Sequence, residues 1–91
     1  SYATLLGQIA DQSGAGVAAA KITVTSEETG LARAVTTDDS GNYRIGLLPA
    51  GIYSLAVEAA GFGAREQRGL VLRVGDERRV DIALRPGQVS E

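Results

Sequence analysis

Few side chains in this sequence could take part in covalent or proton-transfer chemistry. The 91 residues include no histidine and no cysteine, so histidine-based triads, thiol nucleophiles and ordinary zinc sites are excluded. A serine–lysine pair would have to use Lys21, the only lysine, and the sequence places no serine beside it. We therefore expect the chain not to be an enzyme, and we assign it no catalytic residue, no cofactor and no metal ligand.

Six of the eleven acidic residues form three pairs of sequence neighbours, which are Glu27-Glu28, Asp38-Asp39 and Asp76-Glu77. Adjacent residues on a strand point to opposite faces of the sheet, so none of these pairs is a ready acid/base couple. The segment DDSGN, residues 38–42, has the composition of a calcium loop but lacks the alternating ligand spacing of an EF-hand. We interpret it as a turn, because Asp and Ser side chains bond to nearby backbone amides.

Two binding chemistries would need particular side chains in particular places. A lysine–asparagine isopeptide crosslink could use only Lys21 and Asn42. We exclude it because Asn42 falls in a turn, whereas crosslinked partners must be buried on neighbouring strands. A sugar-binding platform would use exposed Trp or Tyr. The chain has no Trp, and of its three tyrosines only Tyr2 is expected to be exposed, so glycan binding rests on Tyr2 alone.

The charge distribution bears on nucleic acids, membranes and protein partners. Nine basic and eleven acidic side chains give a net charge of −2, which argues against a protein that binds nucleic-acid phosphates. Five of the eight arginines lie close together, interrupted by acids and without an aromatic to stack on a base; they are Arg65, Arg68, Arg73, Arg78 and Arg79. We interpret them as a solvated strand face that could contact an acidic partner. The longest uncharged run has 13 residues, fewer than the roughly 18 that a membrane helix requires, so no membrane insertion is expected.

Seven segments show the alternation of apolar and polar residues that predicts β-strands. They are residues 2–10, 21–26, 31–37, 43–45, 52–60, 70–74 and 78–85. The side chains expected to point inward are Leu5, Gly7, Ile9, Ile22, Val24, Tyr43, Ile45, Tyr53, Leu55, Val57, Ala59, Leu70, Leu72, Val74, Val80, Ile82 and Leu84. Residues 61–69 are expected to form a crossing loop or irregular strand. The poor alternation of 31–37 indicates an edge strand or a strand lying flat on the surface. Because no segment has helical periodicity, we predict an all-β, two-sheet sandwich in preference to a closed barrel.

A single domain with an aliphatic core is expected, because 91 residues would divide into pieces too small to bury a core. The chain has one Phe and neither Trp nor Met. Tyr43 and Tyr53 are expected to place their rings in the core with each hydroxyl bonded at the rim, and Phe62 is expected to close one end of the sandwich. Pro49 should mark the point where the chain leaves one sheet for the other.

The pattern TxDxxGxYxIxxLPxGxYxLxVxAxGF resembles the signature of the carboxypeptidase regulatory-like domain family. It falls on Thr37, Asp39, Gly41 (with the spacing altered by one), Tyr43, Ile45, Leu48, Pro49, Gly51, Tyr53, Leu55, Val57, Ala59, Gly61 and Phe62. The upstream stretch LLGQIADQSGAGVAAAKITVTSEETG resembles the opening of the same family. The resemblance implies a seven-stranded antiparallel Greek-key β-sandwich, prealbumin/transthyretin-like, over residues 1–85, with residues 86–91 as a linker toward a following domain of a longer parent protein.

Several stretches narrow the resemblance further. TVTSEETG, TTDDSGNYRI, LPAGIYSL and GLVLRVGDERRVDIALRPGQVSE are together similar to the amino-terminal extension of Oar-like TonB-dependent outer-membrane receptors. This similarity implies a non-catalytic accessory domain at the periplasmic face of the outer membrane, a spacer or docking module ahead of the plug. Its contacts would be with a protein partner or neighbouring domains, through an exposed edge such as 31–37 by strand addition. The alternative is an accessory or carbohydrate-binding domain of a secreted peptidase or cell-surface protein.

Overall fold

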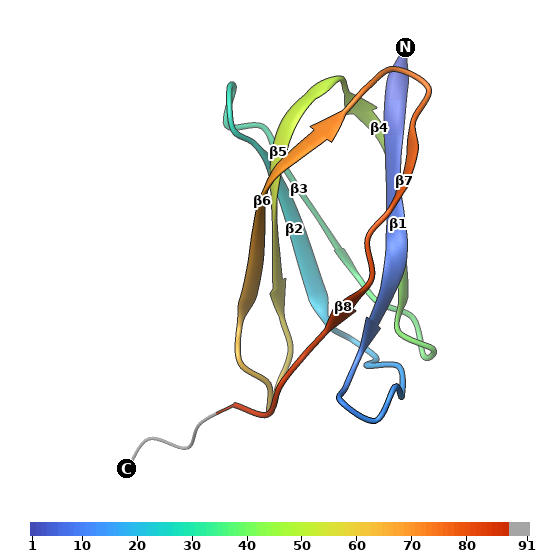
Figure 1. Ribbon diagram of the computed structural model, residues 1–91, viewed down its shortest axis with the longest axis vertical. Helices are drawn as coiled ribbons and strands as arrows, with labels where there is room; N and C mark the ends of the chain where they lie inside the picture. The colour runs from blue at the N-terminus through green and yellow to red at the C-terminus, as the bar shows by residue number, and fades with distance from the viewer. Residues whose placement is uncertain (88–91) are drawn as a thin grey trace.

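Two β-sheets packed face to face make up the structure, a computed structural model that describes residues 1–87 (Figure 1). One sheet has the order β4-β1-β7, with β8 also paired to β1, and the other has the order β3-β2-β5-β6. The strands are β1 (Tyr2–Ala10), β2 (Lys21–Ser26), β3 (Ala32–Thr36), β4 (Asn42–Pro49), β5 (Gly51–Glu58), β6 (Arg65–Leu72), β7 (Glu77–Arg79) and β8 (Ile82–Ala83). The predicted all-β sandwich is confirmed. Within the described residues, no helix has the length and apolar character needed to cross a bilayer.

Alternation along the strands creates the core between the sheets. In β1 burial alternates residue by residue, because successive side chains point to opposite faces. The buried apolar residues are Ala3, Leu5, Ile9, Ala20, Ile22, Val24, Tyr43, Ile45, Leu48, Tyr53, Leu55, Val57, Leu70, Leu72, Val80, Ile82 and Leu84. The predicted inward set is confirmed with two exceptions. Ala59 is only half-buried, and Val74 is 60% exposed in the loop after β6.

Two tyrosines lie inside this otherwise aliphatic core with their hydroxyls bonded to backbone carbonyls. The Tyr43 hydroxyl donates to the carbonyl oxygen of Val80 at 2.6 Å, and the Tyr53 hydroxyl donates to that of Pro49 at 2.6 Å. Each bond satisfies the one polar group that the ring carries into the interior. The roles predicted for both tyrosines are confirmed.

The burial of Tyr43 makes the stability of the domain sensitive to alkaline pH. Burial raises the pKa of Tyr43 to about 12, and the Asp81 carboxylate adds to the effect. The phenol of the unfolded chain has a pKa of about 10, so this stabilising contribution is complete below that pH and is lost as the pH rises toward 12. We expect the free energy of unfolding, measured in urea, to fall by about 2 kcal/mol from this source between about pH 8 and about pH 11.5. The Tyr43→Phe variant should lack this part of the pH dependence; an unchanged slope would contradict the assignment.

The chain passes between the sheets at residues 49–51, as predicted from Pro49. β4 pairs with β1, whereas β5 pairs with β2 and β6. β4 is longer than the predicted 43–45 and contains a bulge, because Gly46 and Leu47 together oppose Thr4 of β1. Leu47 has a φ of 55° and is exposed. The bulge therefore turns a large apolar side chain into solvent in a backbone conformation that leucine rarely adopts.

β6 begins earlier than predicted. The sequence predicts a crossing loop or irregular strand over residues 61–69, yet β6 runs from Arg65 and pairs with β5 along its length. The one irregularity in this pairing is a β-bulge, in which Arg68 and Gly69 of β6 together lie opposite Ser54 of β5. Gly69 has a φ of 71°, which glycine adopts without steric strain. β6 is an edge strand, and its first five residues, REQRG, are exposed. These polar and charged residues do not alternate with apolar ones, so the sequence pattern did not predict a regular strand there.

The last predicted strand is instead two short strands, β7 and β8, interrupted at Val80 and Asp81. Both pair with β1 in parallel orientation, whereas the prediction was antiparallel throughout. The interruption lies where the chain crosses Gly7 of β1. Val80 N donates to Leu6 O at 2.8 Å, and Gln8 N donates to the Asp81 Oδ1 atom at 2.8 Å. A side-chain carboxylate thus takes the place of a ladder carbonyl, which keeps β1 bonded while the chain shifts.

Each open side of the sandwich is bridged by an arginine. On one side, Arg33 Nη1 of β3 donates to Gly46 O of β4 at 3.0 Å. On the other, Arg65 Nη1 of β6 donates to Ala83 O of β8 at 3.1 Å. Both arginines lie on edge strands of the β3-β2-β5-β6 sheet. The two sheets are therefore tied together along both sides without sharing a hydrogen-bonded ladder there.

Phe62 lies in the loop between β5 and β6 and packs against the core. This loop is at the end of the sandwich where the described chain leaves (Figure 1). The backbone of Phe62 forms a bridge with Pro86, and Gly87 N donates to Gly61 O at 2.9 Å. The first two residues of the predicted linker 86–91 are thus bonded to the loop before β6. The remaining four lie outside the described residues.

Candidate interaction surface

β3 offers an unpaired row of backbone groups at the edge of its sheet. Among the described residues its one ladder neighbour is β2. At the two ends of this pair, Ser26 N donates to Leu31 O at 2.8 Å and Thr37 N donates to Ala20 O at 2.9 Å. Because residues that face the partner strand alternate with residues that face away, every second residue of β3 directs its N–H and C=O outward. These residues are Ala32, Ala34 and Thr36.

The side chains on the two faces of β3 differ in size and burial. The three outward-bonding residues are exposed, and on the outer face they lie beside Thr25, Thr23 and Lys21 of β2. Arg33 and Val35 alternate with them and are half-buried, Arg33 through its bond to Gly46 O and Val35 against the core. The outer face of β3 is therefore a shelf of small side chains with Lys21 at one end. A shallow depression of about 250 Å³ lies there, lined by Lys21, Ala34, Val35 and Thr36.

The other edge strands are less suited to pairing with a further strand. β6 carries a bulge, charged side chains, and a backbone amide at Gly69 that already donates to Glu27 Oε2 at 2.8 Å. β4 carries the bulge opposite Thr4 and has the Gly46 carbonyl occupied by Arg33. β7 and β8 have three and two residues. Bulges, charges and short length all discourage edge pairing, so β3 is the regular edge that stays open.

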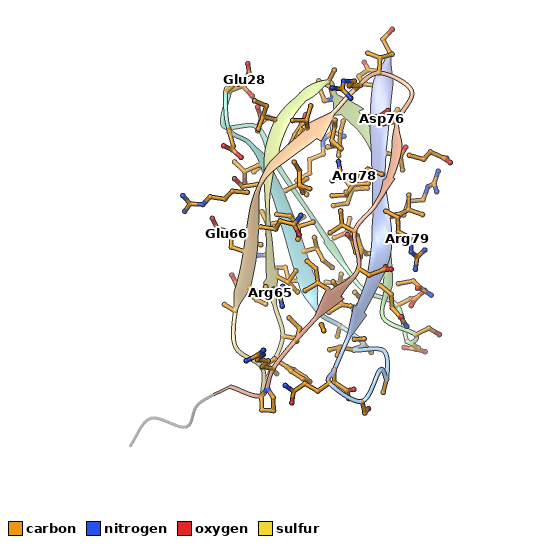
Figure 2. The ribbon with its side chains drawn as sticks, viewed as in Figure 1. Glu28, Arg65, Glu66, Asp76, Arg78 and Arg79 are labelled. Carbon is orange, nitrogen blue, oxygen red and sulfur yellow. The ribbon has the colours of Figure 1, made fainter. Side chains whose placement is uncertain are left out.

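The five clustered arginines do not lie on one surface. Figure 2 shows Arg65 on β6 and Arg79 on β7, which belong to different sheets. Arg68 forms an ion pair with Glu66, and Arg79 pairs with Asp81 at 3.0 Å. These ion pairs are exposed and screened by solvent, so they add little to the stability of the fold. The single basic surface suggested by the sequence is therefore divided between two edges, and a contact with an acidic partner there stays a prediction.

Residues 38–41 of the DDSGN segment form a turn, as interpreted from the sequence, whereas Asn42, also expected in the turn, is the first residue of β4. Asp38 Oδ1 accepts a hydrogen bond from Asn42 N at 2.9 Å, and Gly41 N donates to Asp38 O at 3.0 Å. Asp11 organises its own loop in the same way. The Ser13 hydroxyl donates to Asp11 Oδ1 at 2.6 Å and, with backbone amides, holds the pKa of Asp11 below its usual value. Within residues 1–87, no three His, Cys, Asp or Glu side chains are grouped so that they could hold a metal ion.

The residues considered for a crosslink and for sugar binding lie apart from one another. Lys21 and Asn42 are both exposed and belong to different sheets. Tyr2 is 53% exposed, as predicted, at the end of the sandwich where β1 begins. A separate groove of about 420 Å³ lies on the outer face of β2, β5 and β6. It is lined by Thr23, Thr25, Glu27, Ser54, Ala56, Glu66 and Arg68.

Two residues have structural positions that sequence reasoning missed. Lys21 lies beside an open sheet edge, and this position follows only from the strand order. The signal was the reversal at Thr29-Gly30, since a hairpin there sets Lys21 opposite Thr36. Glu27 was seen only as half of an acidic pair. Its Oε2 atom accepts from the Ser54 hydroxyl at 3.2 Å as well as from β6, so it joins the end of β2 to two further strands.

Comparison with protein families gives a match over nearly the whole chain. The model of the family described as "Carboxypeptidase regulatory-like domain" matches residues 4–85. A curated relative, the TonB-dependent transporter Oar of Myxococcus xanthus, is 35% identical over 89 residues. This alignment covers 97% of the present chain and 8% of the relative. The chain therefore spans only a small part of the length of that relative.

Solved structures share the fold at low sequence identity. A putative carbohydrate binding protein from Bacteroides uniformis superposes with a TM-score of 0.75 at 23% identity, covering 92% of this chain and 41% of that one. GBS52, the minor pilin of Streptococcus agalactiae, superposes with a TM-score of 0.79 at 17% identity, covering 100% of this chain and 47% of that one. At these identities the likeness shows the fold alone.

Proposed function

The chain belongs to the carboxypeptidase regulatory-like domain family, and from this premise we propose that it is a non-catalytic accessory domain of a TonB-dependent outer-membrane transporter. The observation that carries the proposal is the 35% identity to the transporter Oar over 97% of the chain. An enzymatic role has no support in the sequence, which lacks His and Cys. The domain would act beside the transport machinery as a spacer or docking module, on the periplasmic side of the outer membrane.

The shape of the domain suits a spacer. Its principal extents are 44 × 27 × 16 Å, and the strands run along the longest direction (Figure 1). β1 begins at one end, and the described chain leaves at the other. Segments joined to the two ends would be held apart by the length of the sandwich. The arginine bridges on both open sides would keep this separation rigid.

Placement in the periplasm can be tested with one introduced cysteine, since the chain has none of its own. Gln12 is exposed in the loop after β1, so Gln12→Cys in a full-length, otherwise cysteine-free transporter gives a single labelling site. We expect a membrane-impermeant maleimide to label it only after the outer membrane is permeabilised. Labelling in intact cells would place the domain on the cell surface, and labelling only after complete lysis would place it inside. Either result would overturn the proposed location.

Glycan binding is a second candidate, favoured by the polar groove on β2, β5 and β6. Hydroxyls of Thr23, Thr25 and Ser54 and the charged groups of Glu66 and Arg68 line it, and such groups can bond to sugar hydroxyls. Titration with oligosaccharides at millimolar concentration should shift the amide resonances of these residues if the groove binds glycans. An unchanged spectrum removes this candidate and leaves the accessory role standing.

A further inference from the structure

We propose that the free edge of β3 docks an extended segment of a partner protein by strand addition, and that the segment carries an acidic side chain beside Lys21. The proposal rests on the docking role proposed above, and it names the surface and the chemistry of the partner. Three features of the described residues support it. They are the unpaired backbone row of β3, the small side chains on its outer face, and the position of Lys21.

The backbone row determines what kind of partner fits. Ala32, Ala34 and Thr36 present N–H and C=O groups about two residues apart along a straight, unbulged strand. A second extended strand lies about 4.8 Å away and satisfies these groups with its own backbone. Up to six hydrogen bonds could form, because each of the three residues offers one N–H donor and one C=O acceptor. Strand addition of this kind takes its affinity from the main chain and its selectivity from alternate side chains.

The outer face of β3 favours large side chains on the partner. A partner residue opposite Ala34 would have its side chain on the outer face, where the shelf of alanine and threonine leaves space. Partner side chains opposite Arg33 and Val35 would point to the other face, next to a half-buried valine that packs on the core. An apolar residue is the better fit there. The expected segment therefore alternates apolar residues on one face with larger or polar residues on the other.

Lys21 gives the surface its charge preference. It lies on the outer face opposite Thr36 and lines the depression at that end of β3. Its cross-strand neighbour on β5 is Glu58, yet Lys21 takes part in none of the ion pairs formed within residues 1–87. An added strand would lie two strand spacings from β2, about 10 Å, which the long lysine side chain and a carboxylate can span together. An aspartate or glutamate at that position would make the pair.

The position of Arg33 explains why a charged residue on β3 does not block pairing at this edge. Arg33 is the one charged residue of β3, and its bond to Gly46 O directs the guanidinium toward the opposite sheet. The head group is thereby held on the inner side and leaves the outward backbone groups uncovered. Charged residues on edge strands usually discourage pairing; here the charge is turned aside.

The test is selection of binding peptides from a random 12-residue phage library on the 91-residue chain. We expect enriched peptides to alternate apolar with polar residues, to include an acidic residue, and to lose about tenfold or more in affinity for Ala34→Pro. Proline removes the outward N–H and projects its ring toward the added strand, yet it is tolerated at edge positions whose N–H faces solvent. Ala34→Ser keeps the N–H and is the matched control, with affinity within about twofold of wild type. Enriched peptides that bind Ala34→Pro as well as Ala34→Ser, or a selection that enriches none, would overturn the proposal.

Two further arms separate backbone pairing and charge from a fault in folding. Two versions of a selected synthetic peptide are compared, one N-methylated at its odd-numbered residues and one at its even-numbered residues. The version whose methylated amides face β3 should not bind, and the other should bind as before, with no change to the protein. The Lys21→Glu variant should weaken acidic peptides by about three- to tenfold, as for an exposed or partly buried ion pair, and favour a version with lysine in place of the acid. Equal effects of methylation in the two versions would contradict strand addition, and an unchanged charge preference would contradict the role of Lys21. Neither result bears on the periplasmic accessory role, which the cysteine-labelling experiment tests separately.

Discussion

Replacing Gly41 by alanine is expected to destabilise the domain by about 3 kcal/mol or more, through left-handed strain and a steric clash together. Gly41 has a φ of 81°, and an added Cβ atom would lie 2.3 Å from Ile9 O and 2.8 Å from Val17 N. Both of those atoms are backbone and cannot turn aside. They also belong to the bonds that fix the turn to β1, since Ile9 N donates to Gly41 O and Val17 N donates to Ile9 O, each at 2.8 Å.

Gly30→Ala is the matched control for this change. Gly30 has a nearly equal φ of 77°, but an added Cβ atom there meets no atom within 4 Å. It should lose only the backbone strain, about 1–2 kcal/mol. Urea denaturation of both variants, monitored by circular dichroism, separates the cost of backbone strain from the cost of the steric clash. If the two variants are equally destabilised, the close approach of Gly41 to β1 is not what holds the turn in place.

The second large effect is expected at Gly7, where Gly7→Ala should detach the end of the chain from β1. An added Cβ atom would lie 1.9 Å from the Val80 carbonyl oxygen and 2.7 Å from its carbon. The same carbonyl accepts the Tyr43 hydroxyl, so moving it also strands a buried polar group. We expect a loss of about 3 kcal/mol or more, combining overpacking with a broken buried hydrogen bond.

Hydrogen exchange locates this effect in the structure. In Gly7→Ala, the amides of Val80 and Leu84, which bond to Leu6 O and Ala10 O, should lose protection before those of β2 and β5. Gly46→Ala is the control on the neighbouring strand, because an added Cβ atom there would lie 3.9 Å from its nearest neighbour, Thr4 Oγ1. It should leave protection at the end of the chain unchanged. Uniform loss of protection in Gly7→Ala would mean that β7 and β8 do not unfold as a separate unit.

These contacts show how the domain can be rigid and still have one surface open to a partner. The end of the chain is held over β1 by Gly7 and Tyr43, and both sides are bridged by Arg33 and Arg65. β3 is bonded to β2 along one side only. If an extended segment binds at β3 as proposed, the core would not have to rearrange, because the ladder between β2 and β3 is already formed.

Much of the fold could be read from the sequence because the information was local. Alternation in 2–10, 21–26 and 52–60 identified strands and their buried faces, since side chains on a strand point alternately to its two faces. The DDSGN turn was predicted from the bonding habits of Asp, Ser and Gly, which act over a few residues. The alternating pattern predicted a strand over 70–74, but β6 ends at Leu72 because a local hydrogen bond forms a turn after it. The Asp76 carboxylate accepts from Arg73 N at 2.7 Å, and this turn places Val74 in solvent.

The candidate surface could be predicted only in part. Poor alternation in 31–37 indicated an edge strand, and β3 is one. Which of its residues bond outward, and that Lys21 lies beside them, depended on the register with β2. The arginines between 65 and 79 were close in sequence, and the sequence could not show that β6 and β7 belong to different sheets. Proximity along the chain did not give proximity in space here, because the chain crosses from one sheet to the other between β6 and β7.

The sequence by itself determined an all-β domain with an aliphatic core, its family, and a composition without histidine or cysteine. Only the tertiary structure decided that β7 and β8 run parallel to β1, that the five arginines are divided between two sheets, and that the edge of β3 stays unpaired. The physical reason is the range of the interactions. Strand faces and turns arise from neighbours in the chain, whereas pairing direction and edges arise from contacts such as that of Gln8 N with Asp81, which are 73 residues apart. Alternation within one strand carries no record of which strand will lie beside it, or whether any will.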